Sequence, residues 1–82
     1  MHFNEHVKIR EEKFGAVVFE TLREKVFVAN ETGRDILNLM TKGYSEGKII
    51  EALAKEYSVE VASIKEDVLN FISQLKNNNI AQ

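Results

Sequence analysis

The feature that most constrains this chain is a change of hydrophobic pattern at Asn30. Before it lie short β-branched and aromatic runs, the last being Lys25-Val26-Phe27-Val28-Ala29, and such runs are typical of strands. After it, apolar residues recur at helical spacing. Asn30 itself carries a side chain suited to cap a helix N-terminus. The pattern therefore predicts strands before this position and helices after it.

Three strands are predicted, joined as an up-down-up antiparallel sheet. The first covers residues 6–10, where polar and apolar side chains alternate, and residues 11–13 form a polar turn. The second covers 14–20 and is apolar on both faces, as expected of a central strand. The third covers 25–29, and residues 21–24 have the length of a hairpin loop without the Asn-Gly pair of a tight turn.

The two edges of such a sheet differ in charge. Lys8 and Arg10 point outward from the first strand and protect it, whereas the third strand carries no charge between its ends. An unprotected edge presents unpaired backbone donors and acceptors. It is either covered within the monomer, paired with a second copy, or used to bind an extended peptide. These residues alone leave all three alternatives open.

Three helices are predicted after the sheet. The first runs from about Glu31 to Met40 and ends at Gly43, which suits a left-handed cap. The second is capped by Ser45 and runs to about residue 57. The third covers about residues 60–77, and its core side chains share an arc of about 100°. They are Val61, Ile64, Val68, Phe71, Ile72 and Leu75.

Leu69 lies outside that arc, beside Ile72 and between Lys65 and Lys76 on the helix surface. A lone exposed leucine is ordinary on a soluble protein. Next to an open strand edge, however, this strip could form the second wall of a groove. An extended peptide would then bond to the third strand and bury alternate side chains against the third helix.

Composition excludes several kinds of chemistry. The 82 residues fit one small domain, 1–82, and include no cysteine, which removes disulfides, zinc–thiolate sites and iron–sulfur clusters. His2 and His6 lack a third metal ligand, and no catalytic constellation is found, so we expect neither enzymatic activity nor a cofactor. No apolar run could span a bilayer, and the N-terminus lacks the blocks of a signal peptide, which predicts a cytoplasmic protein.

The order and spacing of four segments resemble the PqqD-like family, small peptide chaperones also called RiPP precursor recognition elements. The resemblance covers nearly the whole chain. The matching segments are Arg10-Glu11-Glu12-Lys13-Phe14-Gly15-Ala16, Asn30-Glu31-Thr32-Gly33-Arg34-Asp35-Ile36, Gly43, and Asp67-Val68-Leu69-Asn70-Phe71-Ile72-Ser73-Gln74-Leu75. Two places depart from the family pattern: the loop 21–24 is less turn-like, and residues 77–79 lack a glycine.

The resemblance implies an α+β, winged-helix-like fold with a three-stranded antiparallel sheet followed by three helices. It also implies that the third strand and third helix clamp the leader segment of a ribosomally made precursor peptide. The peptide would then be delivered to a modifying enzyme, usually a radical S-adenosylmethionine (radical SAM) protein. Carried over to this chain, the peptide-binding residues would be Lys25, Val26, Phe27, Val28, Ala29, Lys65, Val68, Leu69 and Ile72.

Two further functions compete with the peptide chaperone. One is a winged-helix DNA-binding protein whose third helix enters a major groove. The net charge of -2 and three acidic against two basic residues on that helix argue against a nucleic-acid partner, because phosphate binding needs clustered positive charge. The other is a structural subunit that forms a homodimer by pairing its third strands across a two-fold axis.

Overall fold

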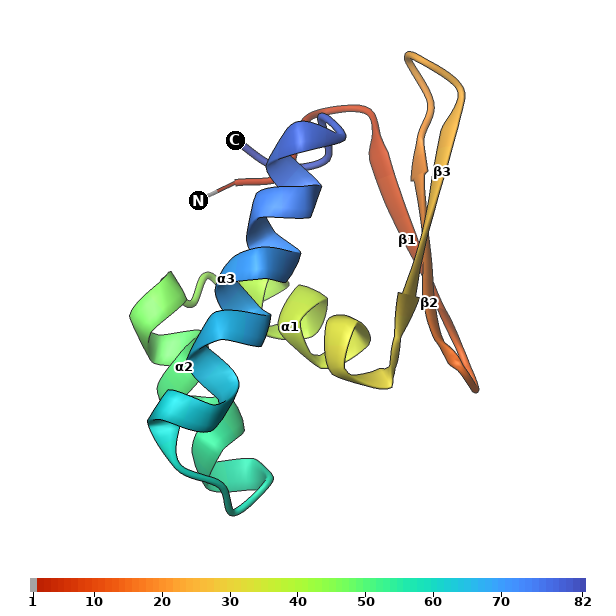
Figure 1. The fold of residues 1–82 in the computed structure, drawn as a ribbon. Helices are drawn as coiled ribbons and strands as arrows, with labels where there is room; N and C mark the ends of the chain where they lie inside the picture. The colour runs from red at the N-terminus through yellow and green to blue at the C-terminus, as the bar shows by residue number, and fades with distance from the viewer. Residues whose placement is uncertain (1) are drawn as a thin grey trace.

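The computed structural model describes residues 2–82 and consists of three strands followed by three helices (Figure 1). The sheet is antiparallel with the order β1-β2-β3, so β1 and β3 are its edges. The predicted α+β fold is confirmed. The elements are β1 (Val7–Glu12), β2 (Gly15–Glu20), β3 (Lys25–Asn30), α1 (Glu31–Thr41), α2 (Glu46–Glu56) and α3 (Val61–Asn77).

The turn between β1 and β2 lies later than predicted. β1 continues to Glu12, which pairs with Gly15, so the predicted turn at residues 11–13 and the predicted start of the second strand at Phe14 are wrong. Phe14 lies in the turn and is half exposed. β2 begins at Gly15, where a Cβ would lie 2.1 Å from the carbonyl oxygen of Ala29. Only glycine allows β2 to start this close to β3.

A buried carboxylate closes the hairpin between β2 and β3. Glu20 is only 2% exposed, and it accepts hydrogen bonds from the backbone N–H of Arg23 at 2.7 Å and from the Arg23 guanidinium at 3.4 Å. Glu24 completes the loop with a left-handed φ of 55°. This loop therefore makes its turn without the Asn-Gly pair that short hairpins usually carry.

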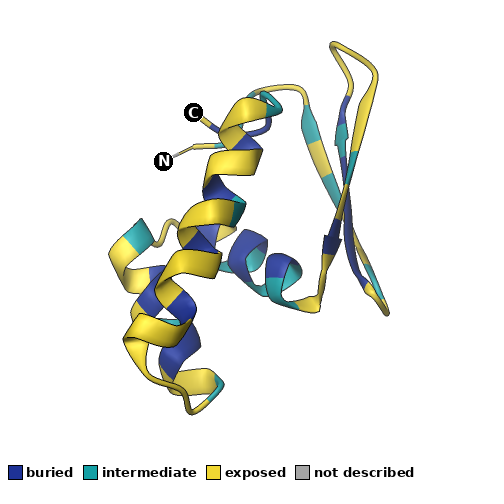
Figure 2. Ribbon diagram, viewed as in Figure 1, coloured by how far each residue is buried: buried dark blue, intermediate teal, exposed yellow. Residues whose placement is uncertain are grey.

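The helix boundaries follow the predicted caps. The Asn30 side chain accepts a hydrogen bond from the Gly33 N–H at 2.9 Å, and Ser45 caps α2 in the same way. Gly43 has a φ of +88°, the left-handed conformation expected after α1. Val61 was predicted to face the core, but it is 48% exposed. The first turn of α3 is exposed (Figure 2).

The helices pack against one face of the sheet and against one another, and the chain termini meet beside the end of α3 (Figure 1). Ile80 is buried, and its carbonyl accepts a hydrogen bond from the Asn4 N–H at 2.9 Å. Within residues 2–82, none of the helices combines the length and apolarity that crossing a membrane requires. The fully buried large side chains include Ile36, Leu37, Ile49, Leu53, Val68, Ile72 and Leu75.

Candidate functional site

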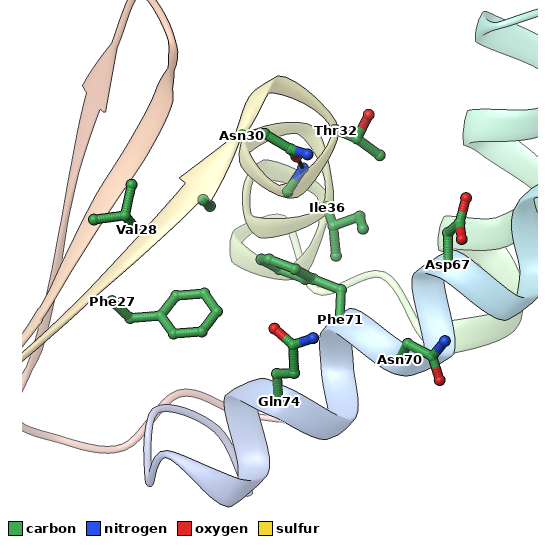
Figure 3. A pocket seen from close by; sticks show the side chains of 11 residues that line it. Phe27, Val28, Asn30, Thr32, Ile36, Asp67, Asn70, Phe71 and Gln74 are labelled. Atoms are coloured by element: carbon green, nitrogen blue, oxygen red, sulfur yellow. Dashed lines mark hydrogen bonds between the residues drawn. The ribbon is translucent and has the colours of Figure 1, made fainter.

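A groove of about 490 Å³ lies between β3 and α3, with the start of α1 at one end (Figure 3). We call it the β3–α3 groove. It is open at the surface and is formed where three elements converge without filling the space between them. Its lining residues are Phe27, Val28, Ala29, Asn30, Thr32, Gly33, Ile36, Asp67, Asn70, Phe71 and Gln74.

The backbone of β3 has a free edge, and the sheet register shows which groups it offers. The Thr21 N–H donates to the His6 carbonyl at 2.8 Å, so His6 and Thr21 form a hydrogen-bonded pair between β1 and β2. Hydrogen-bonded pairs alternate along an antiparallel ladder, and a residue bonded to one neighbour is not bonded to the other. Phe27 therefore bonds to β2, whereas the N–H and C=O groups of Val26 and Val28 point away from the sheet.

Side chains along β3 alternate between two faces of the sheet. Phe27 and Ala29 point toward the helices, whereas Val26 and Val28 are 62% and 63% exposed on the opposite face. Of the third-strand residues that were predicted to bind the peptide, Phe27 supplies a side chain to the groove. Val26 and Val28 supply backbone groups at the free edge of β3. Lys25 lies at the hairpin end of the strand and does not line the groove.

Two aromatic rings, one from each wall, contact each other in the groove. Phe27 from β3 and Phe71 from α3 have ring centroids 5.8 Å apart at 65°, an edge-to-face arrangement (Figure 3). Gly33 makes room for this pair, since a Cβ there would lie 2.7 Å from Phe71 Cε1 and 2.9 Å from Ala29 Cβ. A glycine in the first turn of a helix costs stability. Here it allows α1, β3 and α3 to approach closely.

The α3 wall of the groove differs from the predicted one. Val68 and Ile72 are 0% and 2% exposed because they belong to the core, so their side chains do not line the groove. Lys65 and Leu69 line a separate hollow on an adjoining face of α3. The residues that do line the groove repeat at helical spacing (i, i+3, i+4, i+7). They are Asp67, Asn70, Phe71 and Gln74.

Sequence reasoning missed three of these wall residues and placed the fourth, Phe71, only in the core. The sequence did contain an indication of them. The four residues follow the same helical period as the buried arc, and they lie along the border of that arc opposite to the one that carries Leu69. The periodicity alone did not say which border faces β3. The binding roles predicted for Lys65 and Leu69 remain predictions.

The groove is polar at its rim and nearly uncharged. Among the described residues that line it, Asp67 alone carries a charge, and amide or hydroxyl groups come from Asn30, Thr32, Asn70 and Gln74. Such a surface can receive hydrogen bonds and apolar side chains together. Residues 2–82 hold no group of three or more His, Asp or Glu side chains placed to hold a metal ion.

Comparison with known proteins agrees with this architecture. Residues 5–81 match the family described as coenzyme PQQ synthesis protein D (PqqD). TbiB1, solved in complex with the TbiA(beta) leader peptide, superposes with a TM-score of 0.92 at 22% identity, covering 100% of this chain and 95% of TbiB1.

A lasso peptide synthetase B1, complexed with the leader peptide, gives a TM-score of 0.88 at 21% identity, covering 99% of this chain and 95% of the other. At these identities the likeness establishes the fold. No curated protein matches the sequence.

Proposed function

Because the chain belongs to the PqqD family, we propose that it is a non-catalytic peptide chaperone. It binds the leader segment of a ribosomally made precursor peptide in the β3–α3 groove. The observation that carries this proposal is the free backbone edge of Val26 and Val28 beside that groove. The leader peptides bound by the two proteins of the same fold, TbiB1 and the lasso peptide synthetase B1, support it.

Binding proceeds by strand addition. A guest strand at the edge of β3 exchanges hydrogen bonds with the N–H and C=O groups of Val26 and Val28 and extends the sheet by one strand. Alternate side chains of the guest then point toward α3, where Phe27 and Phe71 offer an apolar contact. Backbone bonds give affinity with little sequence preference, so the side-chain contacts decide which peptide is bound.

The modification itself belongs to a partner enzyme, which on the strength of the family is a radical SAM protein. The chaperone holds one end of the precursor and leaves the rest of that peptide outside the groove. Holding the leader raises the effective concentration of the segment to be modified at the enzyme. The radical SAM partner is tested by measuring whether the chain and a maturase encoded beside it form a complex that the precursor stabilises.

A proline at Val28 tests strand addition directly. The backbone N–H of Val28 points to the free edge of β3. Proline at this position therefore removes a donor offered to the guest strand without removing a hydrogen bond to β2. We expect peptide affinity to fall roughly tenfold or more, since one hydrogen bond is lost and a guest carbonyl is left unpaired. The matched control is Val28→Thr, which keeps the N–H and the β-branched shape.

The ligand for this test is a fluorescein-labelled peptide chosen from a library of random dodecapeptides displayed on phage and selected on the wild-type chain. Binding is measured by fluorescence anisotropy, and circular dichroism establishes that the proline variant is folded. Equal affinity of a folded Val28→Pro and the Val28→Thr control would exclude strand addition at β3.

A second copy of the chain competes for the same edge, because two β3 strands could pair across a two-fold axis. Sedimentation at low micromolar concentration separates the two occupants. A dimer that dissociates when peptide is added uses β3 as its interface. A dimer that persists with peptide bound uses another surface, which removes the dimeric alternative at β3.

A further inference from the structure

The residues that line the β3–α3 groove also determine which peptides can bind there. Resting on the proposed function, we infer that it selects a guest in which a lysine or arginine lies two residues from an apolar residue. Asp67 pairs with the basic side chain, and Phe27 and Phe71 receive the apolar one.

The spacing of the two contacts matches the repeat of a strand. Asp67 and Phe71 are four residues apart on α3, which places them about 6 Å apart along the helix axis. Side chains on one face of a strand repeat every second residue, about 6.6 Å apart. α3 runs alongside β3 in the opposite direction (Figures 1 and 3). Two successive inward side chains of an added strand therefore meet Asp67 and Phe71 in turn.

Charge favours a basic side chain at the first of these positions. Asp67 alone is charged among the described lining residues, so no positive group within the groove competes for it. The basic residues of α1 and α3 are paired or line another hollow, and Lys25 lies at the hairpin end of β3. Arg34 pairs with Asp35 at 3.4 Å, Lys76 pairs with Glu46 at 3.7 Å, and Lys65 lines the adjoining hollow.

The second position favours an apolar side chain. Phe27 and Phe71 are partly buried against the core, and each leaves part of its ring exposed to the groove. A guest side chain packed between β3 and α3 would cover both rings, and burial of apolar area is the main favourable term in such contacts. Asn70 and Gln74 flank the contact with amide groups that can bond to polar parts of the guest.

The direction of the guest fixes the order of the motif. A strand antiparallel to β3 runs in the same direction as α3, so the basic residue precedes the apolar one. A parallel strand reverses the order. In both cases the spacing is two residues, because side chains at odd spacing point to opposite faces of the sheet.

The inference is tested by selecting random dodecapeptides on the wild-type chain, Asp67→Asn and Asp67→Lys. The wild type should enrich a basic residue two positions from an apolar one. Asp67→Asn should still select peptides but without that preference, and Asp67→Lys should enrich an acidic residue instead. Glu66→Gln is the matched control, because this neighbouring carboxylate lines the adjoining hollow and should leave the preference unchanged.

One selected peptide is then synthesised with its basic residue replaced by glutamine. We expect roughly fivefold weaker binding to the wild type, in line with an exposed ion pair, and no difference for Asp67→Asn. The difference should shrink as salt is added.

The outcomes distinguish this inference from the proposed function. Peptides that lose binding in Val28→Pro but show no basic preference on the wild type would overturn the inference and leave the chaperone function intact. Selected peptides that bind Val28→Pro and the wild type equally would overturn the proposed function, and the inference with it.

Discussion

Gly33 and Gly47 form a natural pair for testing how closely α1, β3 and α3 are packed. Both are glycines in the first turn of a helix, where alanine is the better helix former by about 1 kcal/mol. At Gly47 an added Cβ would have no neighbour within 4 Å. At Gly33 it would lie 2.7 Å from the Phe71 ring and 2.9 Å from Ala29 Cβ. The two substitutions therefore have the same chemistry in opposite surroundings.

The expected magnitudes follow from these contacts. Gly47→Ala gains the helix propensity alone and should stabilise the fold by up to about 1 kcal/mol. Gly33→Ala gains the same amount but must move neighbours that lie closer than the 3.4 Å of ordinary contact. Phe71 can turn, whereas the Cβ of Ala29 is fixed to the β3 backbone, so overpacking of roughly 1–3 kcal/mol is expected. The net change at Gly33 is then between about zero and 2 kcal/mol of destabilisation.

Thermal unfolding followed by circular dichroism measures the difference. Since 1 kcal/mol shifts the midpoint by roughly 4–8 °C in a domain of this size, Gly47→Ala should melt above the wild type and Gly33→Ala at or below it. Gly33→Ala should also weaken peptide binding, because the displaced Phe71 ring moves into the groove. Equal stabilisation by both substitutions, with peptide affinity unchanged, would refute the close approach at Gly33.

Two other sites make separate predictions. Burial and the hydrogen bond to Asp35 raise the pKa of Tyr57 to about 12 from its model-peptide value of 10.0. The protonated Tyr57 hydroxyl therefore stabilises the fold below pH 10, and this contribution is lost as pH rises toward 12. In urea unfolding, Tyr57→Phe should lose about 1 kcal/mol of unfolding free energy at neutral pH. Its unfolding free energy should then fall less than that of the wild type at alkaline pH, and an equal fall in both proteins would contradict a role for the Tyr57 hydroxyl. Glu24 has a left-handed φ of 55°, so Glu24→Gly should stabilise the hairpin by about 0.5–1 kcal/mol in the same assay, and destabilisation would show that Glu24 makes a compensating contact.

Features encoded locally could be predicted from the sequence. The Asn30 and Ser45 caps each depend on one side chain and the amide three residues later. The close approach at Gly33 could be anticipated, because a glycine in a helix calls for compensation by packing. The position of β3 at an edge of the sheet followed from the chain order of the strands, whereas its lack of charge left open whether that edge is covered, paired or used.

Features that depend on distant residues could not be predicted in this way. β1 pairs with β2 as far as Glu12 and Gly15, so the turn lies later than predicted. Gly15 also packs against the backbone of β3, a contact between residues that are not neighbours in the sequence. The Glu20 carboxylate gave no sign of being buried, since acidic residues are almost always exposed unless they have a partner. Its partner is the Arg23 N–H in the loop, a group that every residue except proline possesses.

The α3 wall shows most clearly where periodicity stops being informative. A helical repeat identifies the buried arc, but such an arc has two borders of similar composition, and Leu69 drew attention to one of them. Which border faces β3 depends on how α1 and α2 return the chain to the sheet, and this brings the border with Asp67 and Gln74 to the groove. Val68 and Ile72 are buried in the core, and their packing fixes the rotation of α3. Buried core residues therefore determine which side chains of α3 line the groove.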